Sequence, residues 1–267
     1  MIIFEIRNMS EKKRLVGYLF YYEKSRRFFA ELLNETDEWD SPFIFSSHVK
    51  KGIRSIDSVW SAKFVYQRII PTYRQNLGSI LKENDLKVYD EFKLLQLSEG
   101  RCAQDDLYLL RIKEDKILPE IQERLRKKVK DVIPFADFKA LIFFNDGKSC
   151  YADIKEIRGE DISFANVLRK EAVFKNVSVS PGGNGIEWGE ELYIPAESLR
   201  ACGDDALITY DDILFFIKER TSDTTEAAKL LNCSRQYINQ LTEKNRLIPV
   251  RKESALNIYM KSSIEVL

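Results

Sequence analysis

The sequence predicts an α+β fold made of three small units joined by a linker helix. Short runs of β-branched and aromatic residues, separated by turns, fill much of residues 1–35 and 139–195 and are typical of strands. Apolar residues recur at helical spacing in residues 113–132, and two short capped helices are expected in residues 224–243. We therefore expect an α+β domain over 1–112, a linker helix over 113–132, a small α+β sheet domain over 133–203 and a mainly helical domain over 204–267.

Composition limits the class of protein. Lys plus Arg number 42, as do Asp plus Glu, so the whole chain has no net field that attracts a polyanion. The cysteines 102, 150, 202 and 233 are widely spaced and His48 is the single histidine, which argues against a zinc site or a disulfide framework. No apolar run approaches the roughly 18 residues of a membrane span, and the first residues lack an export signal. We expect a cytoplasmic protein with reduced cysteines, no metal and no cofactor.

The first domain begins with expected strands over Ile2–Ile6, Leu15–Tyr22 and Arg26–Leu33, with a turn at Lys24 and Ser25. Helices are expected between Val59 and Ile69, where Pro71 ends the pattern, over Asn76–Leu81 and over Tyr89–Ser98. Trp39 and Trp60 are assigned to the core.

Several motifs of this region resemble the N-terminal subdomain of HipA-type toxin kinases. They are Gly17 with its strands, Phe64–Pro71 (FVYQRIIP), the helix near Asn76, and Tyr89–Leu95 (YDEFKLL) with the Glu99–Cys102 turn (EGRC). Asp105 and Asp106 stand where that family tends to have Gly-Ala. The resemblance implies a subdomain that packs against a kinase core. The sequence contains no recognisable kinase catalytic domain, because a Gly-rich phosphate loop and a catalytic Asp with a metal-binding Asn are missing.

Two connecting helices are expected. Ile117, Ile121, Leu125 and Val129 lie four residues apart, which predicts an amphipathic linker helix that docks on a domain or pairs with a second copy. A bridging helix is expected over Asp204–Arg220, with Leu214, Phe215 and Ile217 buried.

The central domain is predicted from strands and one strong turn. Asn145–Gly147 (NDG) favours a hairpin between strands Lys139–Phe144 and Lys148–Ile154, because glycine accepts a positive φ. We further expect a helix over Phe164–Lys170, strands over Phe174–Val179, Ile186–Trp188 and Glu191–Pro195, and a plain loop over Pro181–Gly185, with Trp188 in the core. The motifs Phe144-Asn-Asp-Gly, Asp153, Phe174-Lys-Asn-Val, Ile186-Glu-Trp and Leu192-Tyr-Ile-Pro-Ala-Glu closely resemble the domain of unknown function family 2442. That resemblance implies an α+β fold and an accessory or interaction role, and it implies no catalytic activity for this domain.

The last domain contains two short helices separated by a three-residue turn. Asp223, or one of the two threonines after it, caps the first helix, and Asp223 with Glu226 has the spacing of a capping box. Asn232 tolerates the left-handed backbone that ends this helix, and Ser234 caps the second one. Ala227, Ala228 and Leu231 of the first helix and Ile238 and Leu241 of the second are expected inside. This geometry is that of a DNA-reading helix-turn-helix.

Residues suited to DNA surround the second helix. From Thr224 to Lys261 there are seven Lys or Arg against three Glu, a local excess that suits phosphates. The candidate DNA-binding residues are Thr225, Ser234, Arg235, Gln236, Tyr237, Asn239, Gln240, Lys244, Arg246, Arg251 and Lys252. The two alanines, the turn at Asn232 and the SRQ opening resemble the excisionase and MerR-like helix-turn-helix family, and Leu247–Arg251 with Leu256–Tyr259 would form its two-stranded wing. That family usually has glycine near Asn232 or Asn245. The alternative is an ordinary helical hairpin with a solvated basic face.

Other polar clusters have weaker patterns. Asp105 and Asp106 beside Arg101 could hold a metal or act as acid and base, but a capping or salt-bridge role is the simpler interpretation. Arg68, Arg74, Gln75, Asn76 and Arg101 could bind an anion if folding brings them together. His48 is expected in a surface or packing role.

The sequence therefore predicts a non-enzymatic, sequence-specific DNA-binding regulator of the antitoxin type. We expect a homodimer that binds double-stranded DNA through its last domain and a protein partner through its first domains. By the resemblance, that partner is a HipA-type kinase. The alternatives are an interaction scaffold in phage defence or counter-defence and an enzyme with its site near Arg101 and Asp105.

Overall fold

The protein, seen in a computed structural model, is described over residues 1–267 except 11–13, 190–191, 203, 207–209 and 254–255. Short helices and several small sheets make up the described residues, which confirms the α+β prediction. The chain forms two compact units, one of residues 1–128 with 179–185 and one of residues 129–178 with 186–267.

The first unit is built on an antiparallel five-stranded sheet in the order β4-β3-β2-β1-β5. The expected strands are confirmed as β1 (Ile2–Asn8), β2 (Leu15–Tyr22) and β3 (Arg27–Leu32). Two edge strands are additional, β4 (Ser55–Ile56) and β5 (Leu107–Ile112). The turn expected at Lys24 and Ser25 is present and extends to Arg26, which was expected to start the strand but has a left-handed backbone with a φ of 54°.

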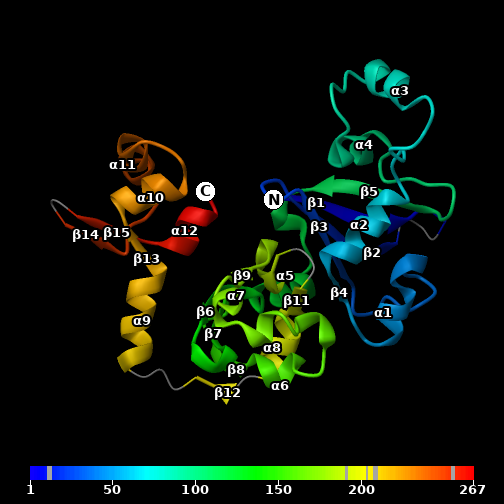
Figure 1. The fold of residues 1–267 in the computed structure, drawn as a ribbon. Coiled ribbons are helices and arrows are strands. Elements are labelled where there is room, and N and C mark those ends of the chain that lie inside the picture. The colour runs from blue at the N-terminus through cyan, green and yellow to red at the C-terminus, as the bar shows by residue number, and fades with distance from the viewer. Residues whose placement is uncertain (11–13, 190–191, 203, 207–209, 254–255) are drawn as a thin grey trace. The chain divides into compact units, whose positions relative to one another are not determined.

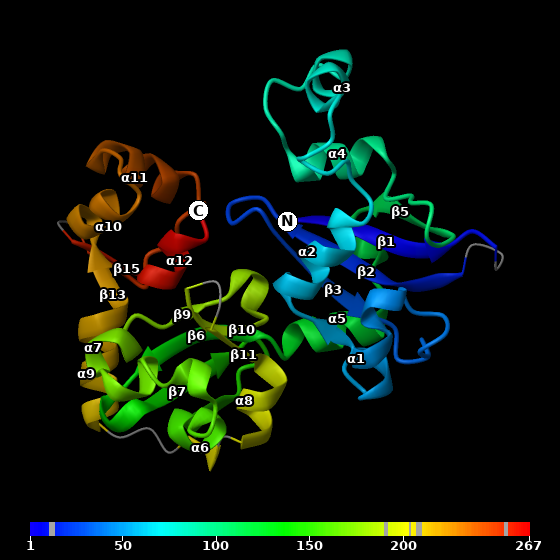
Figure 2. The same ribbon diagram turned by 45° about the vertical axis from the view of Figure 1, so that its right-hand side comes forward.

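Both faces of this sheet are covered (Figures 1 and 2). Alternate residues such as Phe4, Leu19 and Tyr21 face a core shared with α1 (Ser46–Lys50), α2 (Ser58–Tyr66) and α4 (Glu91–Leu97). Ile3, Tyr18 and Phe20 face the opposite way, toward Ile117 and Ile121 of the segment that forms α5 (Pro119–Arg126). A strand buried on both faces loses the polar alternation of a one-sided strand, and β2 is accordingly apolar almost throughout.

The remaining sequence predictions for this unit have mixed outcomes. Helices near the expected positions are α2, α3 (Leu77–Glu83) and α4, and none of the α3 side chains is buried. Trp60 packs partly buried against the core. The assignment of Trp39 to the core is wrong, because its side chain is 87% exposed.

The linker helix predicted over 113–132 is confirmed only over α5, which docks on the sheet of the first unit, and the predicted bounds are wrong. The segment contains a short turn at Glu114–Lys116, the two-turn helix α5, and the strand β6 (Val129–Pro134). Pro119 stands at the first helical position, where its missing N–H is harmless, but it could not continue a helix begun upstream. Val129 has the same four-residue spacing as Ile117, Ile121 and Leu125, but it belongs to a strand paired with β7 (Lys139–Phe144).

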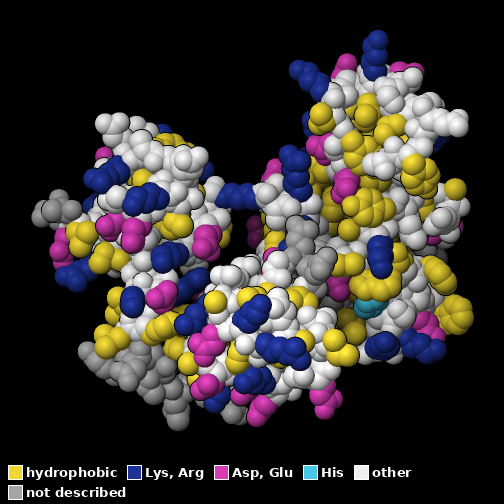
Figure 3. Space-filling model, in the orientation of Figure 1, with side chains coloured by type: hydrophobic (Ala, Val, Ile, Leu, Met, Phe, Trp, Pro, Cys, Tyr) yellow, Lys and Arg dark blue, Asp and Glu magenta, His cyan; other side chains and the backbone are white. Residues whose placement is uncertain are grey.

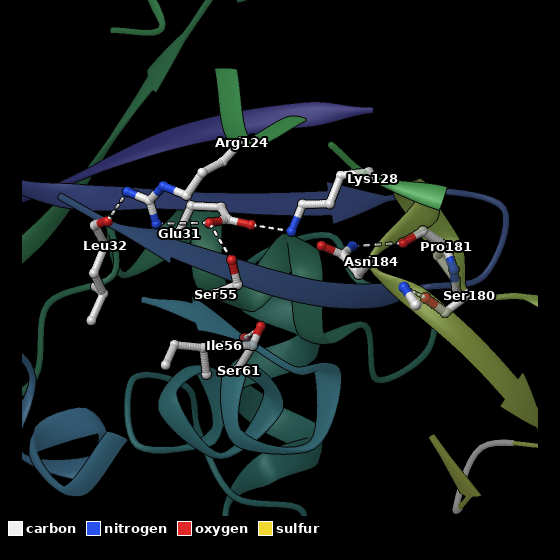
Figure 4. A network of polar contacts seen from close by, with 11 residues as sticks. Glu31, Leu32, Ser55, Ile56, Ser61, Arg124, Lys128, Ser180, Pro181 and Asn184 are labelled. Carbon is white, nitrogen blue, oxygen red and sulfur yellow. Dashed lines mark hydrogen bonds and ion pairs between the residues drawn. The ribbon is translucent and has the colours of Figure 1, made fainter. Parts of the chain in front are cut away.

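A buried carboxylate joins α5 to the sheet (Figure 4). Glu31 on β3 is 1% exposed, and its carboxylate accepts hydrogen bonds from Ser55 Oγ at 2.8 Å and from Arg124 Nη1 at 3.0 Å. It also pairs with the Nζ of Lys128, and Arg124 additionally donates to the carbonyl of Leu32. Two cations and a hydroxyl therefore compensate one buried negative charge, as burial requires.

The glycine-rich segment 181–185 is a packed part of the first unit. Gly182 has a φ of +71°, and a Cβ built there would lie 1.9 Å from the hydroxyl oxygen of Tyr22. Only glycine satisfies both the backbone and this close approach. Burial against the segment raises the pKa of Tyr22 far above its ordinary value, so the phenol stays neutral.

The second unit contains a four-stranded sheet in the order β12-β8-β7-β6, with β8 (Ser149–Asp153) and β12 (Asp204–Asp205). The NDG turn is confirmed between β7 and β8, with Gly147 at a φ of +84°. A three-stranded sheet has the order β11-β10-β9, formed by β11 (Leu192–Pro195), β10 (Gly185–Trp188) and β9 (Ser178–Val179). The short helices α6 (Ile154–Arg158), α7 (Glu171–Phe174) and α8 (Ala196–Cys202) connect these strands.

The segment before β9 differs from the sequence prediction. Instead of a helix over 164–170 it has two single turns at Ile162–Phe164 and Val167–Arg169, and Phe174 ends α7 instead of starting a strand. The carbonyl of Phe174 accepts a hydrogen bond from Trp188 Nε1 at 2.8 Å, and the two rings lie 5.7 Å apart. This buried pair places Trp188 in the core, as expected.

The bridging helix predicted over 204–220 is confirmed over α9 (Tyr210–Arg220), whereas Asp204–Asp205 form the strand β12. Residues 207–209 of that prediction lie outside the described residues. The rings of Phe215 and Phe216 pack 5.4 Å from Phe135 and 5.8 Å from Phe143, and Arg220 pairs with buried Asp131. The prediction that Leu214 and Ile217 are buried is wrong, since they are 47% and 52% exposed. The two adjacent phenylalanines fix which face of α9 packs on the sheet.

Replacing Glu31 with alanine should lower the free energy of unfolding by about 3–5 kcal/mol, because Arg124 and Lys128 would lose the carboxylate that compensates their burial. Urea denaturation followed by tryptophan fluorescence measures this. Glu35→Ala, at an exposed glutamate of the same unit, is the matched control and should change stability by less than about 0.5 kcal/mol. Equal effects of the two substitutions would contradict the role of Glu31.

Candidate nucleic-acid interface

The first helix of the predicted helix-turn-helix starts with a capping box, as expected. It is α10 (Thr224–Leu230), which follows the strand β13 (Thr221–Asp223). Asp223 Oδ1 accepts hydrogen bonds from the backbone N–H groups of Thr225 at 2.6 Å and Glu226 at 2.8 Å. Glu226 Oε2 accepts in return from the N–H of Asp223 at 3.4 Å. Three N–H groups at the start of the helix, which have no acceptor inside it, thus have side-chain acceptors.

The turn between the helices follows the sequence expectation. Asn232 adopts a left-handed backbone with a φ of 50°, and the N–H of Cys233 donates to the carbonyl of Ala228 at 2.9 Å. The chain then enters α11 (Arg235–Glu243), where Ser234 Oγ accepts from the N–H of Tyr237 at 3.2 Å. Local residue chemistry therefore accounts for both ends of the turn.

One small core holds the two helices together. Ala227 and Ala228 of α10 pack with Ile238 and Leu241 of α11, and Leu247, Tyr259 and Ile264 complete the cluster. Alanines allow the helices to approach closely, while Ile238 and Leu241 lie on a single side of α11. The opposite side of α11 is left facing solvent.

A three-stranded sheet flanks the two helices, with one strand before them in the chain and two after them (Figure 1). Its order is β13-β15-β14, with β14 (Arg251–Lys252) and β15 (Asn257–Met260), and the chain ends after α12 (Lys261–Glu265). The hydroxyl oxygens of Tyr259 and Thr242 lie 3.0 Å apart, which joins β15 to α11. The expected wing pairing is present, but its first strand is shorter than Leu247–Arg251, because Pro249 has no N–H to donate.

The candidate DNA-binding residues lie on two neighbouring elements. Ser234, Arg235, Gln236, Tyr237, Asn239 and Gln240 are exposed along α11 and its cap, Lys244 and Arg246 are exposed just beyond it, and Arg251 and Lys252 are exposed on β14. Thr225 is only half-exposed, in the first turn of α10. Polar side chains therefore cover the side of α11 opposite its buried residues.

The charge of this surface is positive but partly compensated. Arg251 donates from Nε to Glu253 Oε1 at 2.7 Å, which reduces what it offers to a phosphate. Among the residues that the structure describes, Arg235, Lys244, Arg246 and Lys252 form no ion pair. Figure 3 shows Lys and Arg side chains over this part of the chain, interspersed with Asp and Glu.

Two apolar residues of this region were not recognised as surface residues from the sequence. Ile248 and Val250 are exposed between α11 and β14, although the expected wing strand included both. Exposed apolar side chains beside a basic surface are able to contact sugars or thymine methyl groups. Strand alternation could not reveal them, because the segment around Pro249 is not a regular strand.

The other polar clusters have internal partners. Asp105 pairs with Arg68, a fully buried side chain whose guanidinium lies 3.7 Å from the Phe64 ring centroid, and Asp105 also accepts from the N–H of Leu107 at 3.1 Å. Arg101 pairs with Glu99, whereas the ion-pair partner of Asp105 is Arg68. Arg74 donates to Asn76 at 3.0 Å instead of joining Arg68, and His48 packs edge-on against Trp60. These contacts favour the salt-bridge and packing interpretations.

Comparison with known proteins adds no relative: no protein-family model, curated protein or solved structure matches this chain. Over its described residues, the chain contains no helix that is long and apolar enough to cross a membrane. Within the same residues, no three His, Cys, Asp or Glu side chains are grouped as a metal site would need.

Asn232 offers a test of the turn. Asn232→Gly should stabilise the protein by up to about 1 kcal/mol relative to Asn232→Ala, because glycine adopts the left-handed backbone without the cost of a Cβ. Thermal unfolding of both variants measures the difference. Asn176→Gly and Asn176→Ala serve as controls, because Asn176 is exposed and is not among the residues with a positive φ. At this position glycine should not stabilise the protein relative to alanine. A higher unfolding temperature for Asn232→Ala would contradict the assignment.

Proposed function

We propose that this protein is a sequence-specific DNA-binding regulator of the antitoxin type. The observation that carries the proposal is α11, which is held from one side by a buried core and presents Arg235, Gln236 and Asn239 on the other. A helix fixed in this way can enter the major groove without changing its conformation. The exposed cations of the following segment and of β14 provide contacts for the phosphates on either side.

Each class of side chain has a distinct role in this proposal. Arg235 pairs with guanine, and Gln236, Asn239 and Gln240 pair with adenine, because their donors and acceptors match those base edges. Lys244, Arg246 and Lys252 bind phosphates and set the position of the helix. A homodimer on a two-fold operator would place two copies of α11 in major grooves about 34 Å apart.

The regulator also has a protein partner in this proposal. The first unit has its own two-sided core and uses none of the DNA-binding residues, so it is available for a separate interaction. The motifs that resemble the N-terminal subdomain of HipA-type kinases fall on α2, α4 and the turn before β5. We therefore propose a HipA-type kinase as the partner that the first unit restrains.

Substituting both Arg235 and Asn239 with alanine should abolish discrimination between an operator and a random duplex, since each base contact contributes about 1–3 kcal/mol. The operator is first selected from a random-sequence duplex library with the wild-type protein. Fluorescence anisotropy with the selected and the scrambled duplex then measures the ratio of the two dissociation constants. An unchanged ratio would refute the assignment of α11.

Lys252→Ala should weaken binding to both duplexes equally. It should also reduce the slope of log K against log salt concentration by about one, because a phosphate contact releases a counterion and does not depend on the base sequence. Titrations at several salt concentrations give the slope. Lys175→Ala, at an exposed lysine elsewhere in the second unit, is the matched control and should leave the slope unchanged. Failure of the wild-type protein to bind any duplex, at low salt as well as high, would favour the interaction-scaffold alternative.

A further inference from the structure

One loop of the first unit presents two aromatic rings to solvent. Trp39 and Phe43 are 87% and 91% exposed, the largest exposed fractions among the tryptophans and phenylalanines described as exposed. They are four residues apart, between β3 and α1. Figure 3 shows hydrophobic side chains at the surface of the first unit in the region of α1. Leaving two such rings in water is unfavourable, because burying an aromatic side chain would remove about 150–250 Å² of surface from solvent and lower the free energy.

The loop that carries the rings is held by many hydrogen bonds. Asp37 Oδ1 accepts from the N–H groups of Trp39 and Asp40, each at 2.8 Å. Buried Thr36 donates from Oγ1 to the carbonyl of Val16 at 2.8 Å, and Ser46 Oγ donates to the carbonyl of Glu38 at 3.0 Å.

The far end of the loop is anchored by packing. Ser41 and Pro42 are buried, and Phe45 lies fully inside the core, 5.2 Å from the ring of Phe64. The rings at positions 39 and 43 are therefore presented by an ordered backbone. Binding through them would cost little conformational entropy, as at the anchor residues of protein interfaces.

The same loop is acidic. Residues 35–40 contain Glu35, Asp37, Glu38 and Asp40 and no basic residue. Asp40 pairs with Arg14 at 2.6 Å, whereas Glu35, Asp37 and Glu38 form no ion pair with any described residue. The hydrogen bonds from the N–H groups of Asp40 and Trp39 hold the pKa of Asp37 below its ordinary value, so it stays charged.

We propose that Trp39 and Phe43 anchor a protein partner, inserting into an apolar pocket whose rim carries Lys or Arg side chains. Charge complementarity with Glu35, Asp37 and Glu38 selects such a rim. Nucleic acid is disfavoured as the occupant, because single-strand sites combine aromatic rings with positive grooves and these carboxylates repel phosphates. Anionic lipid surfaces are disfavoured for the same reason. This inference rests on the protein-partner half of the proposed function and assigns its surface.

The test uses the full-length protein in the cells that encode it. A photo-crosslinking phenylalanine analogue is placed at Phe43, and in a second variant at Tyr73, an 88% exposed aromatic of the same unit. Proteins captured through each position are identified, and the protein enriched at Phe43 is purified. Its affinity is then measured by calorimetry against wild type, Trp39→Ala/Phe43→Ala, Glu35→Gln/Glu38→Gln and Tyr73→Ala. Anisotropy with the selected operator is recorded for every variant.

We expect the Trp39/Phe43 double variant to bind the partner at least about 30-fold more weakly, which corresponds to one anchor residue of about 2 kcal/mol. The glutamine variant should bind more weakly and with less salt dependence, and Tyr73→Ala should bind like wild type. All variants should keep the unfolding temperature and the operator affinity of wild type.

Three outcomes would overturn the inference. A partner whose affinity is indifferent to the Trp39/Phe43 double substitution refutes this surface but leaves the proposed protein partner in place. Capture of DNA or of a second copy of this chain at Phe43 refutes the assigned occupant. Absence of any captured protein at both positions refutes the protein-partner half of the proposed function together with this inference, whereas operator binding remains measurable on its own.

Discussion

The first unit depends on one buried carboxylate. Glu31 lies on β3, next to the edge strand β4, and would be costly to bury alone, so it requires Arg124, Lys128 and Ser55 around it. Arg124 lies on α5 and Lys128 lies just beyond its end, which brings the second face of the sheet under cover. A buried ion network contributes little net stability compared with apolar packing, but breaking it is expensive. We infer that Glu31 specifies where α5 docks, while the apolar contacts of Ile117 and Ile121 supply the stability.

The helix-turn-helix depends on a different principle. Helices of seven and nine residues are too short to be stable alone in water, because the cost of nucleation exceeds what so few hydrogen bonds return. Their order comes from caps at Asp223 and Ser234 and from the core around Ile238 and Tyr259. Since all of these groups lie at the ends or on the inner side of the helices, the outer side of α11 is under no structural demand. Its polar side chains are therefore available to contact a ligand.

The zero net charge of the chain conceals two surfaces of opposite sign. The loop around Trp39 carries unpaired carboxylates, and the segment around α11 carries unpaired cations. Surfaces of this kind choose partners mainly through the rate of encounter and the exclusion of wrong partners. An acidic aromatic loop and a basic helix are suited to different classes of macromolecule, which is the physical reason that we propose two separate binding surfaces on this chain.

The sequence by itself determined the features that depend on neighbours in the chain. The capping box at Asp223, the left-handed Asn232, the glycine turn at Gly147 and the first three strands follow from local backbone preferences and side-chain hydrogen bonds. The candidate DNA-binding residues on α11 could be chosen for the same reason, because helix spacing separates Ile238 and Leu241 from their polar neighbours. The part played by these residues in binding stays a prediction.

Only the tertiary structure decided the features that depend on distant partners. The apolar residues from Ile117 to Val129 have the spacing of one helix. Val129 nevertheless belongs to a strand that pairs with the strand starting at Lys139, and the spacing of the apolar residues gives no sign of that pairing. Trp39, which is assigned to the core from the sequence, is exposed, and Phe45 a few residues later is the aromatic side chain that joins the core. Whether a side chain is buried depends on which other residues pack against it, and these are brought together from distant parts of the sequence only by folding.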